Sequence, residues 1–238
     1  MTAILALSKY RKYCCLNSYG VKVLIRYKDA FNQFIKVHYE FTQVSNKKLM
    51  AKKMKINLGC GSKILSGYTN VDKFNAYNVD LVHDLECFPY PFDDNEATEI
   101  IMHHVLEHIG QKTDTFNQII KELYRICAPG GIIDIKVPHP RHDDFLADPT
   151  HVRPIMPLGL ALYSKSLNEE WVKKGASNSP LAEIHNVNFE MVHINYVIEE
   201  EYMIKMQKGE ISKSELDEMV ATRFNIVKQI DIKWKAIK

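Results

Sequence analysis

The sequence predicts an α/β fold, in which a doubly wound, mostly parallel seven-stranded sheet has an antiparallel strand at its C-terminal end. Three observations lead to this prediction. Short apolar runs alternate with turns or helical segments from Met54 onward. An unbroken apolar run at residues 132–137 is typical of a strand buried on both faces of a parallel sheet. The last two predicted strands instead alternate in polarity, as strands of an antiparallel pair do.

The first four predicted strands are residues 54–58, 68–72, 79–83 and 97–104. The stretch Cys87–Phe92, between the third and the fourth strand, contains two prolines. Proline lacks the N–H group that a central strand donates to its neighbour, so this stretch is expected to form a loop.

The clearest helix is predicted at residues 113–127. Its apolar residues share one helical face: Phe116, Ile119, Ile120, Leu123 and Ile126. Pro129, Gly130 and Gly131 follow, and this sequence ends a helix because proline cannot continue it and glycine favours its terminus.

A long polar segment, residues 138–157, follows the fifth strand and is rich in histidine, aspartate and proline. A loop of this length inside a compact domain is usually functional. The elements predicted after it are a helix at residues 158–174, a strand at 189–199, a helix at 211–222 and a strand at 224–237.

Charge divides the chain into two predicted parts, a basic N-terminal extension at residues 1–53 and a domain at residues 54–238. The extension has eleven Lys and Arg against two Asp and Glu, which leaves 20 basic and 27 acidic residues in the domain. We expect the extension either to be helical and to pack its apolar face on the domain, or to be disordered. The alternative is a basic arm that contacts nucleic acid, an acidic partner or another subunit.

The cysteines of the chain are Cys14, Cys15, Cys60, Cys87 and Cys127. They form no C-x-x-C pair and no recognisable disulfide framework, which favours a reducing compartment. The apolar stretch at residues 1–7 is too short to span a bilayer, and the basic residues that follow it stand in the wrong order for a signal peptide. We therefore expect a cytoplasmic protein without a membrane span.

Two short segments predict a cofactor that contains a nucleoside. One apolar run ends in the turn Gly59-Cys60-Gly61, and a second run ends in Asp72. Glycines let the backbone pass close to a ligand, and an acidic residue at a strand end can accept hydrogen bonds from the two hydroxyls of a ribose. Ile64 stands where a dinucleotide fingerprint needs its third glycine, which disfavours a dehydrogenase.

Four motifs in this order resemble a class I S-adenosylmethionine-dependent methyltransferase. They are Asn57-Leu-Gly-Cys-Gly61, Asn70-Val-Asp72, Val105-Leu-Glu-His108 and a helix that ends in Leu123-Tyr-Arg-Ile-Cys-Ala-Pro-Gly-Gly131 before an apolar strand. Asp148-Pro-Thr-His151 is also similar to small methyltransferases of sugar and surface-polysaccharide pathways. The resemblance implies a Rossmann-like methyltransferase fold, S-adenosylmethionine as the cofactor, and O-methylation of a sugar or a related small hydroxyl compound.

The sequence departs from the family at one point. Only Ser62–Gly67 separates the glycine turn from the second strand, where the family has a helix of several turns. We therefore expect this helix to be short or absent. The N-terminal extension or the loop at residues 138–157 is a candidate cover for the cofactor in its place.

The resemblance also implies roles for single residues. Gly59 and Gly61 would let the backbone approach the methionine part of the cofactor, and Asp72 would bind its ribose. Asp84 and Leu85 correspond to the usual adenine contacts. The residues that the resemblance assigns to cofactor binding are Asn57, Gly59, Cys60, Gly61, Asp72, Asp84, Leu85 and His103.

Methyl transfer to a hydroxyl group needs a general base, and histidine is the usual choice. The candidates are His151 first, then His142, both in the long loop, and His104 at the end of the fourth strand. Glu107 and His108 are expected to be mainly architectural. The loop also carries residue types that bind divalent metals: His139, His142, Asp143, Asp144, Asp148 and His151. Their spacing matches no zinc signature, so no metal site is predicted.

Two other functions remain open at this point. The first is a nucleic-acid methyltransferase that uses the basic extension to bind phosphates, although the sequence has no Asn/Asp-Pro-Pro-Tyr/Phe motif of the amino-directed DNA enzymes. The second is an inactive methyltransferase fold that serves as a binding subunit. The intact Gly59, Gly61 and Asp72 argue against this second alternative.

Overall fold

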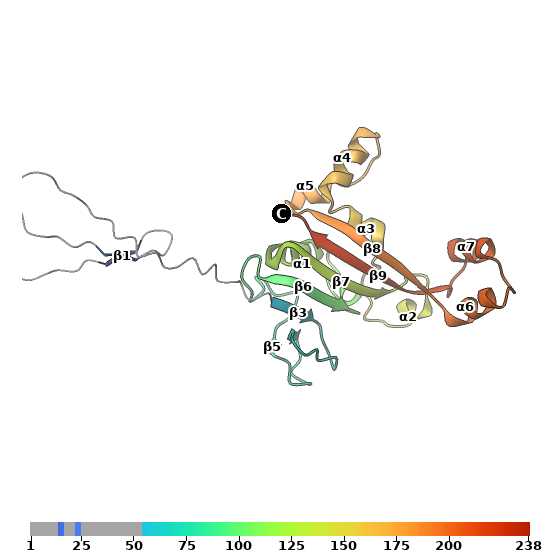
Figure 1. The fold of residues 1–238 in the computed structure, drawn as a ribbon, viewed down its shortest axis with the longest axis horizontal. Helices are drawn as coiled ribbons and strands as arrows, with labels where there is room; N and C mark the ends of the chain where they lie inside the picture. The colour runs from blue at the N-terminus through green and yellow to red at the C-terminus, as the bar shows by residue number, and fades with distance from the viewer. Residues whose placement is uncertain (1–13, 17–21, 25–53) are drawn as a thin grey trace, which may run out of the picture. The chain divides into compact units, whose positions relative to one another are not determined.

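The computed structural model describes residues 14–16, 22–24 and 54–238 (Figure 1). The chain divides into two units, Met1–Met50 and Ala51–Lys238. In the first unit, β1 (Cys14–Leu16) pairs antiparallel with β2 (Lys22–Leu24). The remainder of the predicted helical extension, including its apolar face, lies outside the described residues.

The second unit is built on a seven-stranded sheet in the order β5-β4-β3-β6-β7-β9-β8. The strands are β3 (Met54–Leu58), β4 (Thr69–Asp72), β5 (Leu81–Val82), β6 (Ala97–His103), β7 (Cys127–Pro138), β8 (Phe189–Ile198) and β9 (Val227–Ala236). The strands from β5 to β7 are parallel, whereas β9 is antiparallel to both of its neighbours, β7 and β8. The predicted fold class is thus confirmed.

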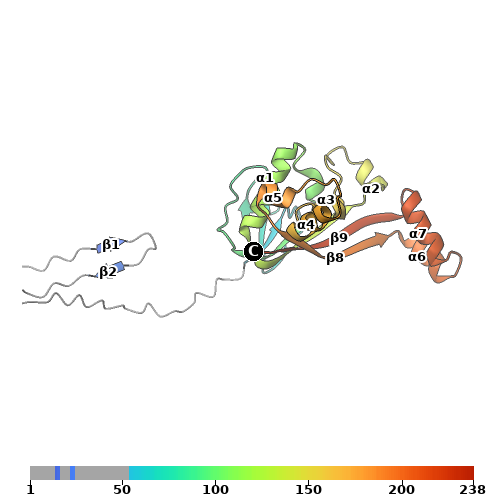
Figure 2. The same ribbon diagram turned by 90° about the horizontal axis from the view of Figure 1, so that it is seen from above.

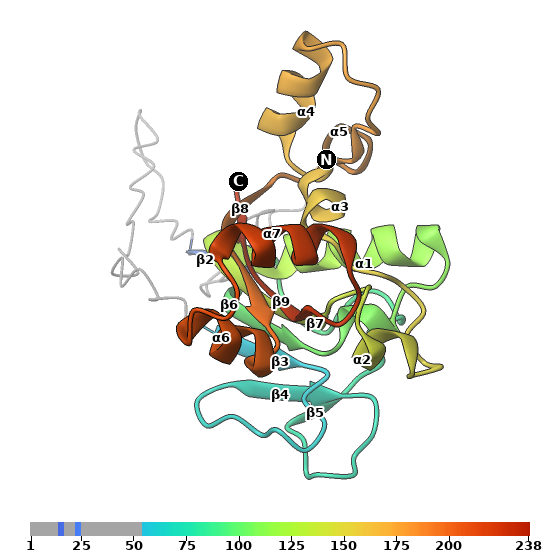
Figure 3. The same cartoon turned by 90° about the vertical axis from the view of Figure 1, so that its right-hand side faces the viewer.

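The strand order reverses at the centre of the sheet. From β3 the chain moves outward to β4 and β5, and then returns to the other side of β3 with β6; Figure 3 shows β4 and β5 at one edge. The connections after β3 and β6 therefore leave the sheet in opposite directions. In open α/β sheets, ligands bind at such a point, outside the carboxyl ends of the strands.

The helices are η1 (Leu106–His108), α1 (Thr113–Ile126), α2 (Asp143–Leu146), α3 (Pro157–Ala161), α4 (Lys165–Lys173), α5 (Leu181–His185), α6 (Glu200–Gln207) and α7 (Lys213–Thr222). The predicted helix at residues 158–174 is divided into α3 and α4, because Ser164 caps a new helix by accepting a hydrogen bond from the Leu167 N–H. Figures 1 and 2 show α6, which the sequence did not predict, beside α7 at the far end of β8 and β9. Within the described ranges, no helix is long and apolar enough to cross a membrane.

The core lies between α1 and the sheet. The apolar face predicted for α1 is buried: Phe116, Ile119, Ile120, Leu123 and Ile126. These side chains belong to one cluster with the buried residues of β3, β6, β7 and β9. At the antiparallel end, Trp234 stacks on Phe189 with ring centroids 3.9 Å apart.

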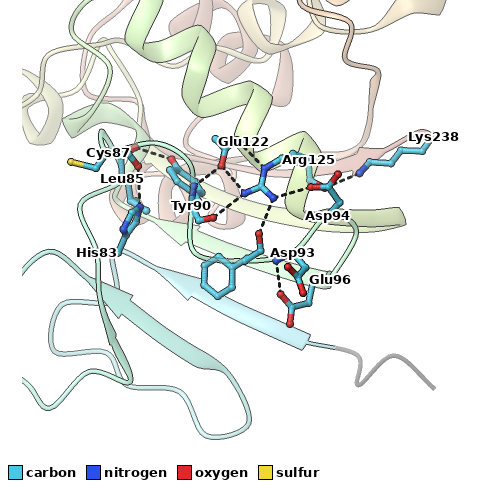
Figure 4. Close-up of polar contacts among 11 residues, drawn as sticks. His83, Leu85, Cys87, Tyr90, Asp93, Asp94, Glu96, Glu122, Arg125 and Lys238 are labelled. Carbon is cyan, nitrogen blue, oxygen red and sulfur yellow. Dashed lines mark hydrogen bonds and ion pairs between the residues drawn. The ribbon is translucent and has the colours of Figure 1, made fainter. Parts of the chain in front are cut away.

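A hydrogen-bonded network fixes the loop between β5 and β6 to α1 (Figure 4). The Arg125 guanidinium donates two bonds to the Glu122 carboxylate and one each to the carbonyls of Tyr90 and Phe92, at 2.8–2.9 Å. Burial raises the pKa of Glu122, but hydrogen bonds from Arg125 and from the Tyr90 N–H outweigh it and lower the pKa below its ordinary value. The Cys87–Phe92 loop, predicted from its two prolines, is therefore firmly held.

Replacing Arg125 with alanine should lower the free energy of unfolding by about 1–3 kcal/mol, because two loop carbonyls and the Glu122 carboxylate lose a charged donor. Urea denaturation measures the change. Lys121→Ala, at an exposed position on the same helix, serves as the control and should change stability by about 0.5 kcal/mol or less. Equal losses in both variants would show that the network does not stabilise the fold.

Candidate functional site

The glycine turn after β3 has the backbone that only glycine adopts easily. Gly59 has φ +64° and Gly61 has φ +50°, both in the left-handed region. A Cβ atom on Gly59 would stand 2.6 Å from Cγ2 of Val105, whereas one on Gly61 would meet no described residue within 4 Å. Gly59 thus permits a close approach between two segments of the chain, and Gly61 faces open space.

Asp72 ends β4 directly beside this turn. Its Oδ2 accepts a hydrogen bond from the Gly61 N–H at 2.9 Å, and its Oδ1 accepts one from the Phe74 N–H at 3.0 Å. A carboxylate has about four acceptor positions, so roughly two remain for another donor. The same carboxylate also affects the neighbouring Cys60, because burial and then the charge of Asp72 raise the pKa of its thiol.

The expected shortening of the helix after the glycine turn is confirmed, since residues 59–68 contain turns and no helix. Two buried amides hold this loop in place. The Asn57 Nδ2 donates to the Lys63 carbonyl at 2.8 Å and to Asn70 Oδ1 at 3.0 Å, and Asn70 Oδ1 also accepts from the Leu65 N–H at 2.8 Å. The side chain of Asn57, which the sequence assigns to the cofactor, is thus directed at the loop.

Three other residues assigned to the cofactor also have partners within the protein. The Asp84 Oδ1 accepts from the Glu86 N–H at 2.9 Å and forms a turn. The side chain of Leu85 is buried in the core. His103 Nε2 lies 3.0 Å from Asp134 Oδ1 on the adjacent strand, β7. The structure therefore brings Gly59, Gly61 and Asp72 together most directly, whereas Asp84 is an exposed turn residue.

A polar pocket of about 410 Å³ lies at the ends of β6 and β7. It is lined by His104, Glu107, His108, Pro138, Asp144, Asp148, His151, Lys228 and Gln229. Two of the three histidines predicted as bases, His104 and His151, are in this lining. The third, His142, is not.

His142 forms hydrogen bonds through both ring nitrogens. Its Nδ1 accepts from the Asp144 N–H at 3.0 Å and caps α2, and its Nε2 lies 3.0 Å from Glu199 Oε1. The residue is also buried, with only 7% of its surface exposed. These contacts tie the loop after β7 to the residue that precedes α6 and leave no ring nitrogen for a substrate.

His151 and His104 differ in their surroundings. His151 Nδ1 donates to the Phe145 carbonyl at 2.8 Å, and its ring stacks on the Phe145 ring at a centroid distance of 5.2 Å. The His104 side chain is 43% exposed, with Nδ1 3.5 Å from Glu107 Oε1. His104 also has φ +58°, so the chain turns sharply where β6 ends.

Glu107 is a site residue that the sequence prediction missed. It is completely buried, and neither carboxylate oxygen has a hydrogen-bond partner among the described residues. The expected architectural role belongs to its backbone carbonyl, which accepts from the N–H groups of Val152 at 2.8 Å and Arg153 at 3.2 Å. The available sequence signal was a carboxylate beside His108 and three residues after His104, immediately beyond a strand.

Strand order and site together define the class of this protein. Five parallel strands, an antiparallel β9 inserted between β7 and β8, a glycine turn after β3 and an acidic end to β4 make a Rossmann-like methyltransferase fold. Residues 73–135, about a quarter of the chain, match the family model described as a methyltransferase domain. This match agrees with the predicted S-adenosylmethionine-dependent methyltransferase. Among curated proteins, none is significantly similar in sequence.

Solved structures with a similar arrangement include an S-adenosylmethionine-dependent methyltransferase from Archaeoglobus fulgidus, with 16% identity, 79% of this chain and 89% of that chain covered, and a TM-score of 0.49. Another, from Mesorhizobium loti, has 13% identity, coverage of 76% and 90%, and a TM-score of 0.42. The 1,6-didemethyltoxoflavin-N1-methyltransferase of Burkholderia thailandensis has 9% identity, coverage of 78% and 71%, and a TM-score of 0.43. With TM-scores below 0.5, the fold assignment rests on the strand order of this chain.

Alanine at the two glycines should affect stability unequally. Both Gly59→Ala and Gly61→Ala incur about 1–2 kcal/mol for a left-handed residue. Gly59→Ala should lose about 1–3 kcal/mol more, because its Cβ overlaps the Val105 side chain. Urea denaturation of both variants measures the difference. Equal losses would mean that the close approach to Val105 is not a constraint.

Proposed function

We propose that this chain transfers a methyl group from S-adenosylmethionine to a hydroxyl group of a small polyhydroxy compound such as a sugar. One observation carries the proposal. Val105 packs against Gly59 of the glycine turn, and the residue before it, His104, lines the polar pocket. The proposed cofactor turn and the proposed acceptor pocket are thereby adjacent in space.

The residues around the glycine turn suit this cofactor. Gly61 offers open space beside the backbone, and Asp72 keeps acceptor positions that suit the two ribose hydroxyls. S-adenosylmethionine supplies an electrophilic methyl group on a sulfonium. The chain itself has to hold the acceptor oxygen in line with that group, remove its proton and exclude water.

The lining of the pocket supports a polyhydroxy acceptor. Every residue of the lining except Pro138 has a polar or charged side chain, and the volume of about 410 Å³ lies in the range of small-molecule sites. Carboxylates, imidazoles and an amide can pair with several hydroxyl groups at once.

We assign the role of general base to His104. It is the most exposed of the three predicted histidines, it stands at the carboxyl end of β6, and its Nδ1 faces Glu107 Oε1 at 3.5 Å. Its Nε2 then remains to take the proton of the acceptor hydroxyl. His151, the first choice from the sequence, is buried by comparison and fixed to the Phe145 carbonyl.

The nucleic-acid methyltransferase and the inactive binding subunit stay predictions from the sequence. A nucleic-acid methyltransferase would depend on residues 1–53, which lie almost entirely outside the described residues. The domain at residues 54–238 has an excess of acidic residues, 27 against 20 basic ones, which does not favour a phosphate backbone.

Calorimetry with S-adenosylmethionine tests the cofactor site. The full chain should bind it, and Asp72→Asn should bind about 10- to 100-fold more weakly, because a neutral amide replaces a charged acceptor. Asp114→Asn, at an exposed position in the first turn of α1, should leave the affinity unchanged. No binding by the unmodified chain would refute the proposed function.

Turnover tests the base. Release of S-adenosylhomocysteine with a panel of monosaccharides and nucleotide sugars should identify an acceptor, and His104→Gln should then lower kcat by about 10²–10⁴-fold while the affinity for S-adenosylmethionine stays constant. His193→Gln, at an exposed position on β8, is the matched control. Undiminished kcat in His104→Gln would exclude it as the base, and turnover of nucleic acid alone would favour the alternative function.

A further inference from the structure

We propose that Glu107, His108 and His151 bind one divalent transition-metal ion of the zinc class in the polar pocket. One ligand atom from each residue lies within 4.8 Å of the other two. All three residues line the same pocket, although they come from segments more than forty positions apart in the sequence. Two imidazoles and a carboxylate are a donor set that suits zinc and its neighbours among the divalent metals.

The first argument is the buried carboxylate. Glu107 has no exposed surface, and its two oxygens have no hydrogen-bond partner among the residues that the structure describes. His104 Nδ1 lies 3.5 Å from its Oε1. Burying a carboxylate charge strongly destabilises a protein unless the charge is paired or coordinates a metal. A cation in the pocket would supply the missing partner.

The second argument is the protonation pattern of His151. Its Nδ1 lies 2.8 Å from the Phe145 carbonyl oxygen, which only accepts hydrogen bonds. Nδ1 must therefore carry the proton of the neutral ring, and Nε2 has a free lone pair. A histidine whose other ring nitrogen donates to a backbone carbonyl is typical of metal ligands.

The third argument is the same pattern at His108. The Thr150 hydroxyl donates its one proton to Asp148 Oδ1 at 2.6 Å. Thr150 Oγ1 therefore accepts from His108 Nδ1, which lies 2.9 Å away, and His108 Nε2 also has a free lone pair. The ring centroids of His108 and His151 are only 4.6 Å apart. Thr150, itself held by Asp148 Oδ1, and the Phe145 carbonyl thus orient the two rings through their Nδ1 atoms. Asp148 Oδ2 lies on the other side of the His151 ring, 3.8 Å from its Nε2.

The site has the composition of a catalytic metal centre. Structural zinc sites use four protein ligands, whereas catalytic sites use three and leave one position open. Here three residues provide the ligands, and the open position would face the space of the pocket. A tetrahedral zinc ion holds its ligand atoms ~3.3 Å apart, so binding would draw the three side chains together. If the proposed function holds, the acceptor hydroxyl is the group that would occupy the fourth position.

These residues differ from the metal-binding set that the loop sequence suggests. Of that set only His151 belongs to the site. His142 lies against Glu199 and Asp144, and His139 Nδ1 accepts a hydrogen bond from the Arg141 N–H at 3.1 Å. The two other ligands come from η1, directly after β6, where the sequence spacing gives no metal signature.

Metal analysis of the purified full chain tests the proposal. After dialysis against a chelator and titration with Zn²⁺, the chain should bind one ion, and Zn²⁺ should raise its unfolding temperature. Glu107→Gln and His151→Gln should each weaken binding by at least ~100-fold. His142→Gln, a buried histidine beside two carboxylates, is the matched control and should keep the affinity. Titration of the metal-free protein with Co²⁺ should give a visible absorption spectrum that both ligand variants lose.

Absence of a stoichiometric ion in the unmodified chain, or full affinity in Glu107→Gln and His151→Gln, would overturn the proposal. The titration of the unmodified chain decides the matter even where a variant does not fold. The test is independent of the proposed function, because Asp72→Asn should weaken S-adenosylmethionine binding and keep the affinity for Zn²⁺, whereas Glu107→Gln should weaken Zn²⁺ binding and keep the affinity for S-adenosylmethionine. Loss of both ligands in either variant would point to a fold defect, which thermal unfolding would reveal, and would count against two separate sites.

Discussion

The close contact between Gly59 and Val105 joins the two halves of the sheet at the point where the strand order reverses. A side chain at position 59 would overlap the Val105 methyl groups, so the turn after β3 and the turn after β6 can meet only through a glycine. This contact sets the distance from the glycine turn to His104, and with it the position of η1. The two proposed binding regions therefore depend on one packing constraint.

A second constraint replaces the helix that is absent after the glycine turn. In the described segment between β3 and β4, Asn57 and Asn70 bind loop carbonyls and N–H groups that a helix would otherwise satisfy internally. Asp80 Oδ2 in turn accepts hydrogen bonds from the Asn70 N–H at 2.7 Å and from the Asn70 side-chain amide at 2.9 Å. Buried polar groups that are fully paired in this way rigidify a short loop, and they keep Gly61 and Asp72 in register without a helix.

Most of the fold could be predicted from the sequence because it depends on local patterns. The period of the apolar residues in α1 and the unbroken apolar run of β7 each identify one element, and Gly59, Gly61 and Asp72 stand at the ends of strands. The sequence predicted an antiparallel end to the sheet but not the position of β9 between β7 and β8. Helix α6 was missed because its polar, weakly periodic sequence differs little from a surface loop.

The pocket could not be predicted in the same way, because its residues meet only through tertiary contacts. Nothing in the sequence around Glu107 indicates that it is buried; that depends on the segment at residues 150–153 folding over η1. Likewise, His142 and His151 look equivalent in the sequence, and only their hydrogen-bond partners distinguish a ring tied at both nitrogens from one with a free lone pair.

Folding the segment at residues 150–153 over η1 costs conformational entropy, and contacts made by Arg153 compensate for this cost. The Arg153 guanidinium donates to the Gly110 carbonyl at 2.8 Å and lies 4.3 Å from the centroid of the Phe116 ring. The backbone N–H of Arg153 donates to the Glu107 carbonyl. Gly110 makes this possible, because any side chain there would overlap Phe116. These contacts anchor the segment to α1 independently of the Glu107 carboxylate. The carboxylate can therefore stay buried without a hydrogen-bond partner among the described residues, as a preorganised group for the proposed cation.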